Sequence, residues 1–169
     1  AECKLKPDQY GICRTRLNRG GELKTDIYGE TVTVAIDPIE KKPLYHFLPG
    51  TAIVSIGPNG CNFSCLHCQN WQISQEKVET TYISPEELPS VAAQRDSIGV
   101  AYTYTEPLIW FEYIKDAAPL IHARGMANVA VSNGYINPEP LRELLPLIDV
   151  FNIDRFSWTP QHPKDRGSC

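Results

Sequence analysis

The chain of 169 residues is 42% hydrophobic and 21% charged, with 11 glycines and 14 prolines, a composition typical of one globular unit with a substantial core. Its formal net charge of −4 provides no basic field of the kind that a phosphate backbone selects, so no nucleic-acid partner is expected. No apolar stretch reaches membrane-spanning length and the amino end shows no signal-peptide pattern, so we expect a cytoplasmic protein without a membrane partner.

Residues 1–50 are predicted to form a small extended module that contains Cys3 and Cys13. Polar and apolar residues alternate along Thr31–Ile36, which indicates a strand, and Asp37-Pro38 is expected to end it. The expected role of this module is packing.

From residue 51 the sequence alternates between short apolar, β-branched runs and longer amphipathic segments. The runs predicted as strands are Ala52–Ile56, Gly99–Tyr104, Asn128–Val131 and Asp149–Ile153. Ser84 and Asn137, each followed by proline, are typical helix starts. Gly125 is expected to end a long helix that begins near Pro107. This alternation of strands and helices predicts a parallel α/β sheet.

Polar residues follow each predicted strand at its carboxyl end. Right-handed crossovers place these ends along one edge of the sheet, which is where α/β proteins bind ligands. The residues expected there are Cys61–Cys68 after the first strand, Glu106 after the second, Ser132-Asn133-Gly134 after the third and Asp154 after the fourth. We therefore expect one site built from several loops.

Cys61, Cys65 and Cys68 form a C-x3-C-x2-C pattern within eight residues. Three thiolates from one loop suit a cubane iron–sulfur cluster and leave one of its irons without a protein ligand. Structural zinc is the first alternative, but it normally takes four ligands in paired C-x2-C form, and only Cys65 and Cys68 have that spacing. A ferredoxin-type run would need a fourth cysteine soon after Cys68, where Gln69-Asn70-Trp71 stands.

An open iron can be chelated by the amine and carboxylate of S-adenosylmethionine, and the cysteine motif resembles that of the radical S-adenosylmethionine (SAM) enzymes, C-x3-C-x-aromatic-C. His67 occupies the aromatic position, and the resemblance implies that it lies beside the adenine. Glu106 stands where the superfamily has a Gly-Gly-Glu-Pro-like segment that approaches the methionyl amine, with Tyr104-Thr105 in place of the glycines. A carboxylate there suits an ammonium partner.

Two further segments carry the resemblance. Ser132-Asn133-Gly134 resembles the S/T-N-G turn that helps to seat the cofactor in activating-enzyme-type members. Asp154 resembles the aspartate of an Asp-Leu-Lys segment, although Arg155-Phe156 follow it here and the lysine is missing. The resemblance therefore implies cofactor contacts from Ser132, Asn133 and Asp154.

A longer joint pattern narrows the resemblance. Ile36–Gly50, Gly60–Trp71 and Ala101–Pro107 together are similar to the AmmeMemoRadiSam system radical SAM enzymes, which are related to pyruvate formate-lyase activating enzymes. In that family Cys3 and Cys13 would be the later cysteines of an amino-terminal cysteine-rich segment. Four polar residues of the pattern are expected to be structural, namely Glu40, Lys41, Lys42 and His46.

The fold implied is α/β, a partial (β/α)6 radical SAM barrel of about four parallel strands over residues 51–156, preceded by the extended module of residues 1–50. Residues 157–169 show neither helical nor strand periodicity and are expected to form an irregular tail. Because the family's barrel has more strands, the chain is expected to be a fragment of a longer enzyme or a truncated form of one.

The function implied is that of a radical SAM enzyme, or a fragment of one, that uses a 4Fe-4S cluster to cleave S-adenosylmethionine reductively to a 5′-deoxyadenosyl radical for hydrogen abstraction. The partners implied are a reductant such as flavodoxin or ferredoxin and, by analogy alone, a protein substrate. Two alternatives stay open. The chain is either a non-enzymatic iron–sulfur or zinc-binding protein, with Cys13 or Cys3 as a fourth ligand, or an inactive truncated remnant.

Overall fold

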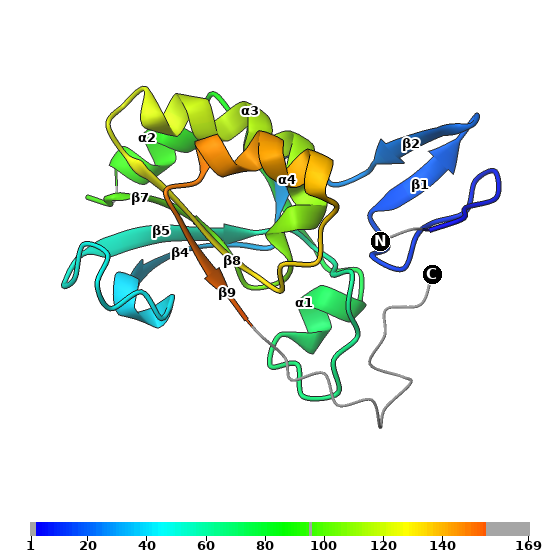
Figure 1. Cartoon of the computed structure of the whole chain (residues 1–169), viewed down its shortest axis with the longest axis horizontal. Helices are drawn as coiled ribbons and strands as arrows, with labels where there is room; N and C mark the ends of the chain where they lie inside the picture. The colour runs from blue at the N-terminus through cyan, green and yellow to red at the C-terminus, as the bar shows by residue number, and fades with distance from the viewer. Residues whose placement is uncertain (1–2, 95, 155–169) are drawn as a thin grey trace.

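A computed structural model of the chain describes residues 3–94 and 96–154. Its main element is a five-stranded sheet in the order β4-β5-β7-β8-β9 (Figure 1). The strands are β4 (Thr33–Pro38), β5 (Ala52–Gly57), β7 (Gly99–Tyr102), β8 (Ala127–Ser132) and β9 (Val150–Ile153). β4 is antiparallel to β5, and the other neighbours are parallel. The predicted strands after residue 51 and their parallel arrangement are therefore confirmed.

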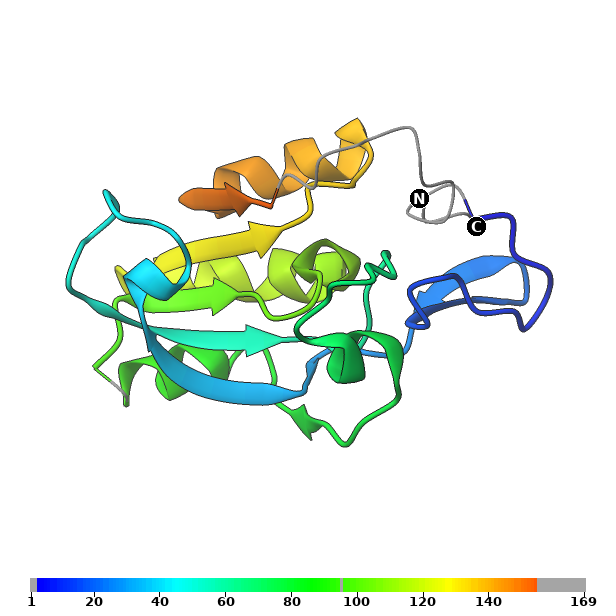
Figure 2. The same cartoon turned by 90° about the horizontal axis from the view of Figure 1, so that it is seen from below.

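Most of the helical residues pack on one face of this sheet, and shorter helical segments lie on the other. The helices are α1 (Trp71–Gln75), α2 (Leu88–Ala93), α3 (Phe111–His122) and α4 (Pro138–Leu144), and the 3-10 turns are η1 (Ile39–Lys41), η2 (Pro107–Trp110) and η3 (Leu145–Leu147). α2, α3 and α4 lie on one side of the sheet, whereas η1 and α1 lie on the other (Figure 1, Figure 2). The fold is mixed α/β and compatible with part of a radical SAM barrel.

The predicted helix signals act at the positions expected from the sequence. The backbone N–H of Glu87 donates to Ser84 Oγ (3.2 Å) and Ser84 N–H donates back to Glu87 Oε2 (3.1 Å), a reciprocal pair of the capping-box type that closes the turn of residues 85–87 directly before α2. Gly125 follows α3 with a φ of 69°, a backbone conformation that favours glycine after a helix. The long helix expected from Pro107 begins instead as the 3-10 turn η2 and continues as α3.

Strand residues alternate between two cores, as the pleat of a sheet requires. Val54, Val100 and Ala130 face the helices and join the larger core, which includes Ile114 and Trp110. On the opposite face Ile53, Ala101 and Val129 pack against Ile39 of η1 in a smaller core. In the part of the chain that the structure describes, no helix is long and apolar enough to cross a membrane.

The segment before residue 51 contributes to several sheets. β1 (Arg16–Arg19) and β2 (Glu22–Thr25) form a hairpin that projects from the main sheet (Figure 1), and β3 (Glu30–Thr31) pairs with β6 (Thr81–Tyr82). β4 lies along the whole of β5, with Thr33 opposite Gly57 and Pro38 opposite Ala52. The strand expected over Thr31–Ile36 is divided, since Thr31 ends β3 and β4 begins at Thr33. The expectation that Asp37-Pro38 ends it is wrong, because β4 extends through both residues, which an edge position allows since proline donates no ladder bond. The predicted irregular tail, residues 157–169, lies outside the described residues.

Gly57 ends β5 where the backbone of the neighbouring loop approaches closely. A Cβ at this position would lie 2.2 Å from the carbonyl oxygen of Thr103. We expect Gly57→Ala to lower the free energy of unfolding by about 1–3 kcal/mol, because the backbone after β7 must move. Urea denaturation measures this, with Gly11→Ala as the control, since its Cβ would meet nothing closer than 3.5 Å. Equal stability of the two variants would contradict the expectation.

Candidate functional site

The cysteine loop (residues 58–70) connects β5 to α1 and carries Cys61, Cys65 and Cys68. All three are half-buried thiols rather than disulfides. Cys61 Sγ accepts the backbone N–H of Phe63 (3.4 Å), and Cys68 Sγ lies 3.5 Å from Ser74 Oγ of α1. His67, in the same loop, has an exposed side chain.

The environment of Cys61 opposes ionisation of its thiol. The pKa of Cys61 is raised to about 12, mainly by burial, with a smaller contribution from negative charge on Glu106, Cys65 and Cys68 and against the lowering effect of the Phe63 N–H. A metal would supply the positive charge that stabilises thiolates here.

The donor set fits an iron–sulfur cluster in chemistry, because one loop offers three thiols. Within residues 3–94 and 96–154, however, no three His, Cys, Asp or Glu side chains are already gathered as a metal site. The loop must therefore rearrange around a metal in order to bring the thiols together.

The cysteine loop is fixed at its flanks by the amino-terminal segment and by α1. Gly60 has a φ of 113°, and a Cβ there would lie 2.6 Å from the carbonyl oxygen of Cys13. The guanidinium of Arg14 donates to Ser74 O (3.3 Å) and to Gln75 Oε1 (3.0 Å). The Gln75 amide in turn donates to Phe63 O (2.8 Å). Residues 13–14 thus pack against the loop just before its first cysteine.

Glu106 lies at the end of the loop after β7 (residues 103–106) and is 1% exposed. Its carboxylate accepts Leu108 N–H (2.9 Å), Ser132 Oγ–H (2.7 Å) and Asn133 N–H (2.8 Å). The structure therefore brings the predicted residues Glu106, Ser132 and Asn133 together. The first of these bonds caps η2, and the other two join the ends of β7 and β8.

Burial dominates the electrostatics of Glu106. It raises the pKa of the carboxyl to about 7, although the Leu108, Asn133 and Ser132 hydrogen bonds lower it, and the charge of Asp154 adds to the rise. Among the ion pairs of the described residues, none includes Glu106. The site thus holds a buried carboxyl group for which these residues supply no cation.

The loop after β8 connects this carboxylate to the cysteine loop. Asn133 Nδ2–H donates to Asn62 Oδ1 (2.8 Å), and Asn62 Nδ2–H donates to Tyr135 O (3.2 Å). The rings of Phe63 and Tyr135 lie 5.4 Å apart. Asn62, directly after Cys61, is 6% exposed. A continuous set of hydrogen bonds therefore runs from the first cysteine segment to Glu106.

Asp154 joins the same edge through its backbone, since its N–H donates to Ser132 O (2.8 Å). Burial raises the pKa of its carboxyl. Asn62, Gln75 and Arg14 could not be identified from the sequence, because an amide side chain or a surface arginine has no pattern that separates it from ordinary polar residues.

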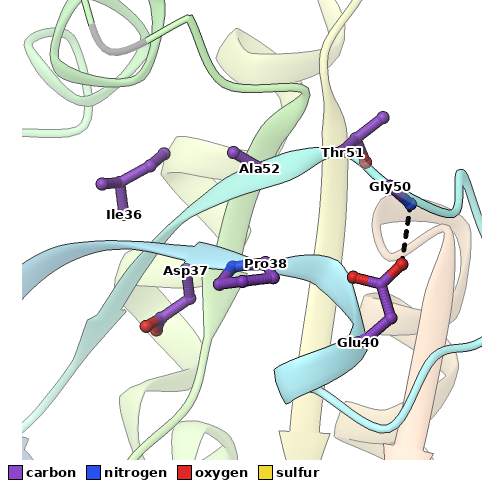
Figure 3. Close-up of a pocket in the computed structure, with 7 residues that line it drawn as sticks. All are labelled: Ile36, Asp37, Pro38, Glu40, Gly50, Thr51 and Ala52. Carbon is purple, nitrogen blue, oxygen red and sulfur yellow. Dashed lines mark hydrogen bonds between the residues drawn. The ribbon is translucent and has the colours of Figure 1, made fainter.

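A separate open hollow lies at the other end of β5 (Figure 3). It is lined by Ile36, Asp37, Pro38, Glu40, Gly50, Thr51 and Ala52, and Gly50 N–H donates to Glu40 there (2.7 Å). Because β5 spans about 20 Å at ~3.4 Å per residue, this hollow is remote from the cysteine loop and is no part of the candidate site.

Comparison with known proteins agrees with this arrangement. Residues 55–167 match the Radical SAM superfamily, a range that contains the three cysteines, Glu106 and the loop after β8. An uncharacterized protein of Methanocaldococcus jannaschii is 45% identical over 155 residues, which cover 90% of this chain and 46% of that protein. The chain therefore spans about half the length of this relative. The chain belongs to the radical SAM superfamily.

Proposed function

We propose that the chain binds a 4Fe-4S cluster through Cys61, Cys65 and Cys68 and binds S-adenosylmethionine at the edge formed by the loops after β5, β7 and β8. A reduced cluster would supply the electron that cleaves the sulfonium of S-adenosylmethionine into methionine and a 5′-deoxyadenosyl radical for hydrogen abstraction. The single observation that carries the proposal is the set of hydrogen bonds that joins the buried Glu106 carboxyl through Asn133 to Asn62, the residue directly after Cys61, in a chain of this superfamily.

Glu106 is the proposed partner of the cofactor's ammonium group. A carboxylate offers about four acceptor positions, and Leu108, Ser132 and Asn133 use three of them in the structure. The remaining position suits one charge-assisted hydrogen bond. Glu106 is 1% exposed, so the same rearrangement that gathers the cysteines has to open a path to it.

The other proposed cofactor contacts are His67, Ser132, Asn133 and Asp154. Ser132 and Asn133 hold Glu106, and Asn133 reaches the cysteine loop through Asn62, which supports a role in orienting the cofactor. His67 is exposed on the cysteine loop and is proposed to lie beside the adenine on the family resemblance alone.

The finer assignment is also a proposal. We propose membership of the AmmeMemoRadiSam system radical SAM enzymes, related to pyruvate formate-lyase activating enzymes, with a reductant such as flavodoxin or ferredoxin in the cytoplasm. A protein substrate is proposed by analogy. The chain matches 46% of its relative, so the hydrogen donor belongs to the activity of a whole protein and is not assigned to residues here.

A non-enzymatic site with four thiols is the second candidate, and one observation favours it. Cys13 is buried, and its carbonyl oxygen packs against Gly60, next to Cys61. Its thiol accepts a hydrogen bond from Thr15 Oγ1 (3.2 Å). If Cys13 ligated the metal, no iron would be open to a cofactor.

The two candidates differ in their response to the cofactor. We expect the chain, reconstituted anaerobically with iron and sulfide and then reduced, to give the electron paramagnetic resonance signal of a 4Fe-4S cluster that changes on addition of S-adenosylmethionine. Replacing Cys61, Cys65 or Cys68 by alanine should abolish the cluster, whereas Cys13→Ala should leave it intact. A signal that ignores the cofactor and is lost in Cys13→Ala would establish the four-thiol site, and a chain without any cluster would be an inactive remnant.

The unfolding of the metal-free chain should reveal the buried carboxyl group. Because the pKa of Glu106 is raised from 4.5 to about 7, its contribution to stability is fully present below about pH 4.5 and is lost as the pH rises through about 7. We expect the stability of wild type relative to Glu106→Gln to fall by about 3 kcal/mol between these limits. Urea denaturation across pH 4–8 measures this difference, and a constant difference would contradict the raised pKa.

Binding of the ammonium group should release the proton of Glu106. With a pKa of about 7, Glu106 is mostly protonated at pH 6, so we expect about 0.9 proton to be released per S-adenosylmethionine bound at pH 6, about 0.3 near pH 7.4 and close to none near pH 8.5. Calorimetric titration of the cluster-loaded chain in two buffers of different ionisation enthalpy counts these protons. Cofactor binding without proton release at pH 6 would show that Glu106 is not the partner of the amine.

A further inference from the structure

Tyr104 adopts a backbone conformation that a bulky residue rarely takes. It lies two residues before Glu106 in the loop after β7, and its φ is 70°. This left-handed region costs glycine nothing but strains a residue with a large side chain. Such strain persists only where surrounding contacts compensate it, and these positions cluster at functional sites. The contacts of the Tyr104 side chain are therefore expected to compensate this strain.

Those contacts belong to a buried charged cluster on the face of the sheet away from the helices. Tyr104 Oη–H donates to Asp37 Oδ2 (2.8 Å), and Lys42 Nζ–H donates to the same oxygen (2.8 Å). The ammonium of Lys42 also lies 4.9 Å from the centroid of the Tyr104 ring, a cation–π contact. The side chains of Asp37 and Lys42 are 6% and 3% exposed. We call these three residues the Asp37 cluster.

The Asp37 cluster is anchored in the amino-terminal part of the chain. Asp37 lies in β4 opposite Ile53 of β5, and Lys42 directly follows η1. Lys41 pairs with the other oxygen of Asp37 (2.7 Å), but its side chain is 61% exposed and screened by water. The buried Lys42 is therefore the lysine that fixes the carboxylate on which Tyr104 rests.

Tyr104 and Thr105 are bonded to the two flanks of the cysteine loop. Thr105 Oγ1–H donates to Pro58 O (2.7 Å), before the first cysteine, and Asn70 Nδ2–H donates to Tyr104 O (2.6 Å), after the last. Glu106 follows in the same loop. The side chain of Tyr104 thus ends in the Asp37 cluster, while its carbonyl oxygen and the hydroxyl of Thr105 connect the cysteine loop to the segment that carries Glu106.

We propose that Tyr104, held by Asp37 and Lys42, is a positioning residue that sets the distance between the cysteine loop and Glu106. This inference rests on the proposed function, in which these two elements bind the cluster and the cofactor's ammonium group. Tyr104 touches neither group itself. It acts through its own carbonyl and the two residues that follow it, and it gives Asp37 and Lys42 a role in the site although they lie outside it.

Tyr104→Phe tests the role of the hydroxyl and keeps the ring that Lys42 contacts. In the metal-free chain we expect the amides of residues 103–108, Pro107 excepted, to exchange with deuterium about tenfold to a hundredfold faster, as expected for the loss of one hydrogen bond to a charged group. In the cluster-loaded chain the paramagnetic signal without cofactor stays unchanged, and the S-adenosylmethionine concentration needed for half of its change rises by a similar factor. Tyr45→Phe, at a side chain that is 64% exposed, is the matched control.

Tyr104→Gly separates side-chain contacts from backbone strain. Glycine relieves the strain but removes the ring and the hydroxyl, so we expect amides 103–108 to exchange at least as fast as in Tyr104→Phe. Exchange or cofactor response of Tyr104→Phe equal to that of Tyr45→Phe would overturn the proposal, as would wild-type exchange in Tyr104→Gly. If the wild-type cluster ignores S-adenosylmethionine, the proposed function fails, and the exchange data alone decide whether Tyr104 holds the loop.

Discussion

The carboxylate of Glu106 is the contact on which the arrangement of the site depends. It accepts one N–H from its own loop and two donors from the loop after β8, so one side chain fixes the ends of β7 and β8 relative to each other. Asn133 extends this connection to Asn62 in the cysteine loop. Burial makes the charged form of Glu106 costly, and a cationic ligand would offset that cost where the described residues do not.

The cysteine loop is anchored at both of its ends. Pro58 and Asn70 are bonded to the loop after β7, and Gln75 holds the carbonyl of Phe63. Between these anchors Leu66 is 87% exposed. To gather the three thiols around a metal, the segment between Phe63 and Asn70 would have to bring Cys65 and Cys68 towards Cys61, which lies beside the anchored Asn62.

The sequence was most informative where one local pattern decides the structure. The apolar runs at 52–56 and 128–131 predicted strands correctly, because strands buried between helices and η1 require apolar, β-branched residues. Ser84 likewise indicated the helical segment that follows it. The pairing of β4 with β5 was not predictable from alternation alone, since alternation indicates a strand but not its neighbour. The meeting of Glu106 with Ser132 and Asn133 followed from topology, whereas the bond from Asn133 to Asn62 depends on loop conformations that no spacing encodes.

Tyr104 shows how a substitution can add a function to a backbone position. The family pattern expects a glycine there, and the structure keeps the glycine-like φ of 70° while the side chain reaches Asp37. A glycine would give the loop its shape without fixing its place, because it has no side chain to anchor. The backbone of Tyr104 is strained, but its side chain is anchored to the buried Asp37–Lys42 ion pair. That pair is stable only while both residues are present, because removal of either leaves an uncompensated buried charge. The position of Glu106 thereby depends on β4 and η1, which carry Asp37 and precede Lys42, respectively. The amino-terminal part of the chain thus helps to shape the site, whose geometry would otherwise be determined only by the loops that follow the parallel strands.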